Sequence, residues 1–207
     1  MRVKIPSLTL ITDSSRYPDD LLFSVLEKTL DHGVDAVLLR EKQLSSAKLL
    51  ALASRLRELT SAYEAALYIH TQADIAVAVD ADGVHLASGD MSNIPGIRGW
   101  LNDANKTVSV SCHSLTEIRM AEQHGADFLF LSPVFPTASH PGAKHLGADA
   151  FIDIVSQSRL PVIALGGIDG DNCHEIQGHG VAVISALLAA DDPTLAAISL
   201  RQQGKQG

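Results

Sequence analysis

The chain has 207 residues, of which 46% are hydrophobic and 19% charged, and its formal net charge is -8 at pH 7. This length and composition are typical of one globular domain with a large core. The negative charge excludes the basic face that a nucleic-acid-binding protein needs, so nucleic acid is not an expected partner.

The first thirteen residues contain a short apolar stretch that runs into Asp13, which is typical of a first strand and not of a signal peptide. No apolar run reaches the roughly 18 residues of a membrane span, so we expect a cytoplasmic protein without a membrane partner. Cys112 and Cys173 lack metal-like or redox-like spacing and are expected to be reduced. The histidines show no HExxH spacing, so no zinc site is predicted.

Short apolar runs recur along the chain, each followed by a polar turn. They lie at 8–13, 34–40, 66–70, 82–86, 107–112, 127–132, 161–167 and 180–185. Apolar runs without polar alternation are typical of parallel strands that are covered on both faces. The sequence therefore predicts eight buried parallel strands.

Helical patterns separate these runs. In the segment 45–66 leucines recur at three- and four-residue spacing, and Ser45 or Ser46 can cap its start. The segments 114–127 and 150–160 behave alike, and Gly125 suits a helix C-terminus.

The repeat of strand and helix places the chain in the α/β class and predicts a single (β/α)8 TIM barrel over residues 1–207, with a frayed tail at about 201–207. An open doubly wound sheet is the alternative, but no GxGxxG fingerprint follows the first strand. The oligomeric state stays open, with a homodimer as one option.

In a TIM barrel, ligands bind where the strands end, so polar residues just after each apolar run are the candidates for a site. These residues are Asp13, Arg40, Glu41, Lys42, His70, Thr71, Asp90, Ser111, His113, Thr137 to His140, Gly166, Gly167 and Ser185.

The last two predicted strands end in residues that suit an anion. Gly166 and Gly167 allow backbone N–H groups to approach a phosphate, and Ile184 and Ser185 end the run at 180–185. Because this end of a barrel is a common phosphate site, we predict a phosphate cradle here. The alternative is a tight turn at the glycines and a helix cap at Ser185.

Two cations leave the second predicted strand together. Arg40 and Lys42 flank Glu41, and such a pair can grip a phosphate or pyrophosphate while the carboxylate orients the cations. The alternative is a surface ion-pair cluster.

The long loop at 132–147 is expected to act as a lid, in which Thr137 and Ser139 can bind phosphate oxygens and His140 can transfer protons. A solvated loop with incidental polar residues is the alternative. Asp90 can hold Mg2+ against a substrate phosphate, or it can cap a helix.

Together these motifs resemble the thiamine-phosphate synthase and thiazole tautomerase superfamily over nearly the whole chain. The matching pieces are LITD at 10–13, LREK at 39–42, ADGVHL at 81–86 with Asp90, SVSCHS at 109–114, SPVFPT at 132–137, ALGGI at 164–168 and GVAVIS at 180–185.

The resemblance implies a transferase that condenses hydroxymethylpyrimidine diphosphate with thiazole phosphate, with the help of Mg2+, to give thiamine phosphate and pyrophosphate. It implies that Arg40 and Lys42 bind the diphosphate, that Asp90 binds the metal, and that Ser111 contacts the leaving pyrophosphate. The residues implied for the thiazole phosphate end are Thr137, Ser139, Gly167, Ile184 and Ser185, and Gly166 of the predicted cradle stands beside them.

The sequence departs from the synthase pattern at three places. His70-Thr71 stands where the pattern has Asn-Asp, Leu38 stands where it has Gln, and Ser139-His140 stands where it has Thr-Lys. One of the two expected metal carboxylates is thus absent, and His70 and His140 become candidates for substrate binding and catalysis.

These departures keep two alternatives open. One is a thiazole tautomerase, which needs a proton shuttle; the histidine expected in that branch aligns with Pro133, so His140, His113 or His70 would have to replace it. The other is a barrel that binds phosphorylated metabolites without catalysis. All three functions have small phosphorylated molecules as partners.

Overall fold

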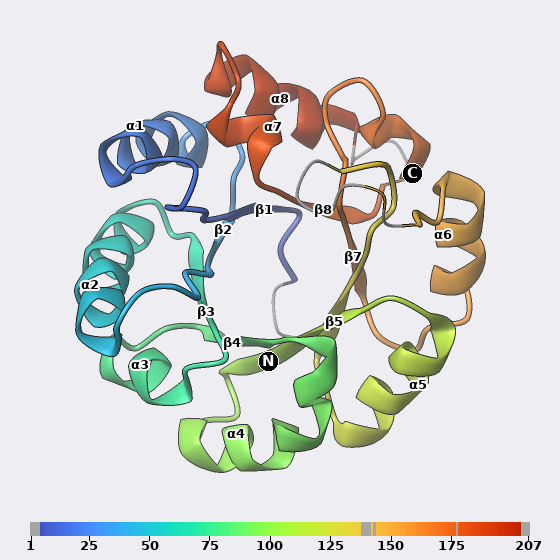
Figure 1. Ribbon diagram of the computed structural model, residues 1–207, viewed down its shortest axis with the longest axis horizontal. Helices are drawn as coiled ribbons and strands as arrows, with labels where there is room; N and C mark the ends of the chain where they lie inside the picture. Colours follow the sequence, from blue (N-terminus) through green and yellow to red (C-terminus); the bar gives the residue numbers. More distant parts are fainter. Residues whose placement is uncertain (1–4, 138–141, 143, 177, 204–207) are drawn as a thin grey trace.

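The computed structural model describes residues 5–137, 142, 144–176 and 178–203. Its eight strands are parallel and form a closed barrel in chain order, with β8 paired to β1 (Figure 1). The strands are β1 Leu8–Ile11, β2 Ala36–Leu39, β3 Ala66–His70, β4 Gly83–Leu86, β5 Thr107–Cys112, β6 Phe128–Leu131, β7 Val162–Leu165 and β8 Gly180–Val183. The predicted barrel is confirmed, and the alternative of an open sheet is wrong.

Helices form a ring outside the strands (Figure 1). They are α1 Asp19–Leu30, α2 Ser46–Ala62, α3 Ala73–Ala78, α4 Ile94–Leu101, α5 Leu115–His124, α6 Ala148–Val155, α7 Ser185–Leu188 and α8 Pro193–Gln203, with two short 3-10 helices, η1 Ser88–Asn93 and η2 Cys173–Ile176. In the described part of the chain, the crossover from β7 to β8 holds only η2, so the strand and helix repeat is incomplete there.

The helix termini agree with the sequence in part. Gly125 ends α5 in the left-handed conformation, with φ 86°, as predicted. Ser45 precedes α2, but its side chain makes no capping hydrogen bond. Helix α6 covers 148–155, earlier than the predicted 150–160, and α8 continues to Gln203. The frayed tail at about 201–207 stays a prediction, because residues 204–207 lie outside the described residues.

The strands are buried on both faces because the barrel has two hydrophobic layers. The outer layer packs strand residues such as Leu10, Val37 and Ile69 against the helices. The inner cluster lies inside the barrel and contains Ile11, Ala36, Leu38, Tyr68, Phe128, Phe130, Ile163 and Ala182. This double burial explains the continuous apolar runs in the sequence.

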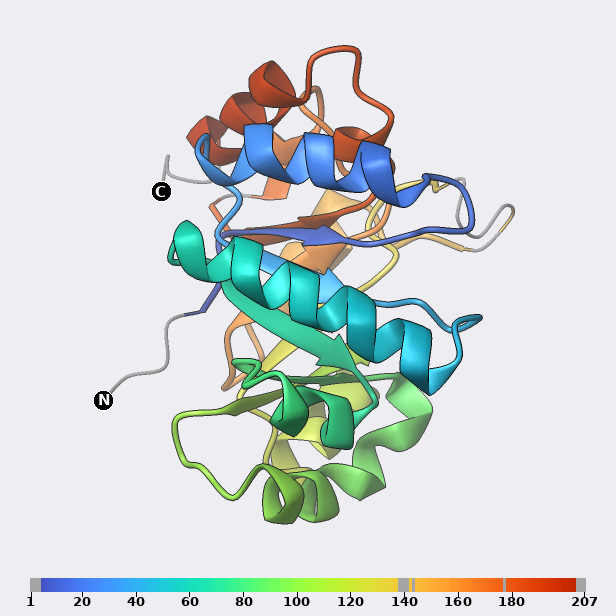
Figure 2. The same ribbon diagram turned by 90° about the vertical axis from the view of Figure 1, so that its left-hand side faces the viewer.

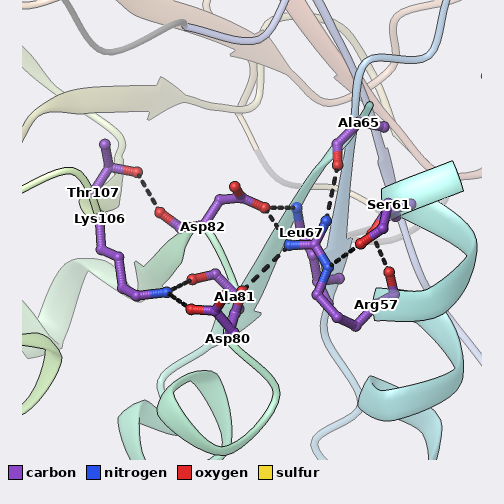
Figure 3. Close-up of polar contacts among 10 residues, drawn as sticks. Arg57, Ser61, Ala65, Leu67, Asp80, Ala81, Asp82, Lys106 and Thr107 are labelled. Carbon is purple, nitrogen blue, oxygen red and sulfur yellow. Dashed lines mark hydrogen bonds and ion pairs between the residues drawn. The ribbon is translucent and has the colours of Figure 1, made fainter. Parts of the chain in front are cut away.

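Three aspartates fasten neighbouring strands at the N-terminal end of the barrel. Asp35, Asp82 and Asp127 each precede an even-numbered strand and accept a backbone N–H from the preceding odd-numbered one, at Leu8, Leu67 and Val108 with distances of 3.0, 2.7 and 2.7 Å. Asp82 is also paired with Arg57 at 2.6 Å (Figure 3). These contacts support the fold on the side opposite to the strand ends.

The loops after the strands gather at the other end of the barrel, toward which the strand arrows in Figure 2 point. We call these loops the rim. Because all strands are parallel, every candidate that follows a strand lies on the rim.

Candidate active site

Arg40 continues the inner face of β2, on which Ala36 and Leu38 belong to the inner cluster. Its backbone N–H donates to Thr12 Oγ1 at 3.0 Å, which ties the end of β2 to the segment after β1. The Arg40 guanidinium contributes to lowering the pKa of both His70 and His85, so its charge lies over the barrel interior. Arg40 is half-buried and Lys42 is exposed.

Neither cation takes part in a salt bridge with the described residues, which contradicts the alternative of a surface ion-pair cluster. The predicted role of Glu41 in orienting the cations is also wrong. Glu41 is 4% exposed, and its carboxylate accepts hydrogen bonds from the Ser14 backbone N–H, the Ser14 hydroxyl and the Gln43 amide at 2.7–3.0 Å. Glu41 therefore holds the loop after β1, and the two cations stay available for an anion.

His70 ends β3 on the inner face and is followed by a tight turn at Thr71, whose φ is 61°. The Thr71 hydroxyl donates to the His70 carbonyl at 2.8 Å. Burial, together with the charges of Arg40 and Lys42, lowers the pKa of His70 to about 4. His70 is thus neutral at pH 7 and suits a hydrogen bond to a substrate better than proton transfer near neutral pH.

A buried histidine links the inner faces of β4 and β5. The His85 ring lies between two serines, with Nδ1 at 2.9 Å from Ser109 Oγ and Nε2 at 2.8 Å from Ser111 Oγ. The ring is packed against Phe130, with a centroid distance of 4.4 Å. Burial, with smaller contributions from His70 and Arg40, lowers the pKa of His85 to about 3.

His113 follows β5 directly and is exposed. Its Nδ1 lies 2.7 Å from the Ser132 carbonyl, and because a carbonyl only accepts, Nδ1 carries a proton. In the neutral ring Nε2 is then left with a lone pair, which is the form a proton acceptor needs.

Gly166 and Gly167 follow β7 with φ of 95° and 69°, a region that side chains rarely adopt. A Cβ on Gly167 would lie 2.3 Å from the Pro136 carbonyl oxygen, and one on Gly166 would lie 2.9 Å from Pro133. The Phe135 N–H donates to the Gly166 carbonyl at 2.9 Å. The glycines therefore let the loop after β6 pack onto the end of β7, which places Thr137 close to the predicted cradle.

Ser185 is exposed and begins α7, and one residue, Ile184, separates it from the end of β8, which lies next to β7. Ile184, not Ser185, occupies the N-cap position and makes no side-chain capping bond, so the alternative of a helix cap at Ser185 is wrong. The Thr137 side chain is half-buried. The predicted residues Ser139 and His140 lie outside the described residues.

Asp90 is the third residue of η1 and is half-buried. Ala87 is the N-cap residue, so the alternative of a cap at Asp90 is wrong. Its carboxylate makes no hydrogen bond or ion pair with the described residues, and those residues contain no group of three or more His, Cys, Asp and Glu side chains arranged to hold a metal ion. One free carboxylate fits Mg2+ that is held jointly with substrate phosphates and water, because Mg2+ commonly takes only one or two protein carboxylates.

The order of the strands divides the candidates into two halves of the rim. Arg40 follows β2, His70 ends β3, Asp90 follows β4 in η1, and Ser111 lies near the end of β5; these four strands are consecutive in the barrel. We call this set the β2–β5 half. The second set follows β6, β7 and β8 and contains Thr137, Gly166, Gly167, Ile184 and Ser185; we call it the β6–β8 half. Two substrates bound side by side across the mouth would each face one half.

His85 and Ser109 are the members of this site that sequence reasoning missed as functional candidates. His85 lies within a strand and was therefore not among the candidates, which were chosen at the strand ends. The sequence feature that could have indicated this cluster is the spacing of the serines. Ser109 and Ser111 are two residues apart on one strand and so share a face, and His85 lies on the neighbouring strand.

The fold and the rim define a (β/α)8-barrel with a candidate anion site at the C-terminal ends of its strands. The thiamine monophosphate synthase family model matches residues 8–189. A thiamine-phosphate synthase of Methanobrevibacter smithii is 33% identical over 96% of this chain and 95% of its own. One of Chloroflexus aurantiacus is 37% identical over 86% of this chain and 83% of its own.

A solved structure, the thiamine phosphate pyrophosphorylase from Pyrococcus furiosus, superposes with a TM-score of 0.84 and 34% identity over 96% of this chain and 95% of its own. The chain belongs to the thiamine monophosphate synthase family. The family predicted from the motifs is therefore confirmed.

Proposed function

We propose that the protein condenses hydroxymethylpyrimidine diphosphate with thiazole phosphate to give thiamine phosphate and pyrophosphate, as a transferase of the thiamine-phosphate diphosphorylase type. The family supports this reaction, since the matched relatives carry the name of this synthase. The observation that carries it here is Arg40, a cation over the barrel interior that no described carboxylate neutralises.

In this proposal the β2–β5 half binds the diphosphate. Arg40 and Lys42 hold its charge, and Ser111 donates a hydrogen bond to an oxygen that becomes the leaving group. When the carbon–oxygen bond breaks, the electron pair goes to pyrophosphate and the pyrimidine methylene becomes cationic. Positive groups gathered on the departing anion lower the barrier to this step.

The β6–β8 half holds the second substrate. Backbone N–H groups near Gly167, Ile184 and Ser185, with Gly166 beside them, are proposed to bind the thiazole phosphate, and Thr137 and Ser139 to bind its oxygens. This arrangement presents the thiazole nitrogen to the cationic methylene, and their bond completes thiamine phosphate. His140 is proposed to replace the lysine of the synthase pattern.

Asp90 is the residue proposed to hold Mg2+, which when bound neutralises diphosphate charge. Thr71, at the position of the missing carboxylate, uses its hydroxyl on the His70 carbonyl, so the metal would depend more on substrate oxygens than on the protein. Leu38 is 1% exposed in the inner cluster and presents an apolar surface below Arg40 where the synthase pattern has an amide. We place the protein in the cytoplasm, with small phosphorylated molecules as its partners.

The test is Arg40→Ala, assayed for pyrophosphate release from the pyrimidine diphosphate in the presence of thiazole phosphate. We expect kcat/KM to fall at least about 100-fold, as is typical when one donor to a developing anion is removed. Arg119→Ala is the matched control, because Arg119 lies on α5 and pairs with Glu122 there. Turnover by Arg40→Ala equal to that of the control would contradict the proposal.

The tautomerase alternative is favoured by one observation, the lone pair that the Ser132 carbonyl leaves on His113 Nε2. If that function holds, His113→Gln abolishes metal-independent conversion of the thiazole phosphate tautomer, and Ser185→Asp costs more activity than Asp90→Ala because the added charge repels the phosphate. Equal losses of this activity in Ser185→Asp and Asp90→Ala would contradict the tautomerase alternative.

A further inference from the structure

His85 lies in the middle of a chain of hydrogen bonds that connects the barrel interior with the rim. Its ring joins Ser109, deep in the barrel, to Ser111, which lies one inward position closer to the rim. Ser109 is 1% exposed and His85 is 2% exposed, whereas Ser111 is half-buried. The three residues thus form a chain that runs from the interior toward the candidate substrate.

The neutral imidazole has one donor and one acceptor nitrogen. His85 is neutral in the folded protein because burial holds its pKa far below neutrality. Only two arrangements of the chain are therefore available, and they differ in which serine receives the ring proton.

In the first arrangement Nδ1 carries the proton and donates to Ser109. The Ser109 hydroxyl would then have to place its own proton elsewhere, and it has no other hydrogen-bond partner among the described residues. A buried hydroxyl proton without an acceptor is unfavourable. The Ser111 proton would meanwhile point inward, to Nε2 and away from the rim.

In the second arrangement every buried group is satisfied. The Ser109 hydroxyl donates to Nδ1, the Nε2 proton is donated to Ser111 Oγ, and the Ser111 hydroxyl is free to donate toward the rim. Phe130 packs against the ring and limits its rotation, with a centroid distance of 4.4 Å. Donors and acceptors that are aligned in one direction polarise one another, so the last hydroxyl becomes a better donor.

We infer that His85 is a positioning residue that commits the Ser111 hydroxyl proton to an anionic oxygen at the rim, through a one-way chain from Ser109 to His85 to Ser111. This inference deepens the proposed function, on which it rests for the identity of the anion, the departing pyrophosphate. His85 itself does not touch the substrate in this account.

The tautomer can be tested without any assay of activity. Nitrogen-15 NMR of the labelled wild-type protein distinguishes a protonated from an unprotonated ring nitrogen, and the His85 signals are those lost in His85→Gln. We expect the proton on Nε2 of His85. A proton on Nδ1 would overturn the inference even if the protein proves to be a synthase.

Two matched substitutions test the consequence for the anion. The amide nitrogen of Gln lies close to the position of His Nε2 and can donate to Ser111, whereas that of Asn lies close to Nδ1 and reaches only Ser109. In binding experiments with inorganic pyrophosphate, we expect the Kd of His85→Asn to rise by about 5- to 10-fold, as after the loss of one neutral hydrogen bond, and that of His85→Gln to stay within about 2-fold of wild type.

Turnover gives a second readout. His85→Asn is expected to lower kcat by a similar factor with little change in KM for thiazole phosphate, and Ser111→Ala combined with His85→Asn should be no worse than Ser111→Ala alone. Equal effects of Asn and Gln, or additive effects in the double variant, would mean that His85 acts through packing only and would overturn the inference. If the wild type neither binds pyrophosphate nor turns over, the proposed function fails, while the NMR result still decides the tautomer.

Discussion

Buried polar side chains inside the barrel determine much of what distinguishes this site. Arg40 was recognisable in the sequence because it follows a strand and stands beside Lys42 in a chain of net charge -8. The role of His85 was not recognised, because its contacts with Ser109 and Ser111 depend on the register between β4 and β5, which the sequence alone does not give. Glu41 illustrates the same limit: its adjacency to two cations suggested an ion pair, but the backbone turns its carboxylate toward Ser14.

The depressed pKa of His85 also predicts how stability depends on pH. The folded chain binds this proton only near pH 3, whereas the unfolded chain binds it near the ordinary value of 6.5. Between these values the unfolded state therefore holds the extra proton, and the free energy of unfolding falls as the pH decreases from 6.5, by up to about 1.4 kcal/mol per pH unit. Above pH 6.5 the histidine has no such effect.

Urea unfolding at several pH values between 7 and 5 measures this dependence. His85→Gln is the control, because glutamine does not titrate, and we expect a smaller loss of stability on acidification than in the wild type. The same loss in both proteins would show that His85 remains neutral in the unfolded chain or is charged in the folded one, against our account.

At the scale of elements, the hydrophobic pattern predicted all eight strands, because parallel strands buried on both faces have no polar alternation. Their bounds were less predictable: the run at 34–40 begins two residues before β2 and ends one residue after it, at Arg40, and the run at 161–167 continues past β7 into Gly166 and Gly167. The short crossover through η2 was also missed, since no sequence signal distinguishes a closing 3-10 turn from a weak helix. The sequence predicted that Gly166 and Gly167 lie at an anion site. Only the structure shows that they also pack closely against Pro133 and Pro136.

Substitution of the aspartates at the N-terminal end of the barrel is expected to change stability without changing activity. Asp82→Ala leaves the Leu67 N–H without its acceptor, which should lower the free energy of unfolding by about 1 kcal/mol, a modest value because the Asp82 side chain is 46% exposed. We expect kcat/KM to stay unchanged, since this end of a TIM barrel supports the fold and not the chemistry.

Asp80→Asn provides the control from the same cluster, because asparagine also tolerates the positive φ of 54° at this position (Figure 3). The Asp80 side chain is 90% exposed, so its ion pair with Lys106 is screened by water and no measurable change in stability is expected. Chemical denaturation and steady-state kinetics on both variants check the prediction. A loss of activity in Asp82→Ala at unchanged stability would contradict the account, in which the N-terminal end of the barrel supports the fold and the rim carries the chemistry.

At the scale of the whole molecule, the closed barrel brings residues from 40 to 185 onto one rim and sorts them into two halves. The chain order of the strands fixes this arrangement, so the sequence predicted which residues belong together once the barrel was recognised. No helix in the described part of the chain is long and apolar enough to cross a membrane. The oligomeric state and the cytoplasmic location stay predictions.

Incubation of the protein with both thiamine precursors, with and without Mg2+, tests the central claim most directly when pyrophosphate and thiamine phosphate are followed together. We predict that the two products appear in equal amounts, only when both precursors are present, and faster with Mg2+. Absence of both products, combined with metal-independent conversion of the thiazole phosphate tautomer, would contradict the synthase account.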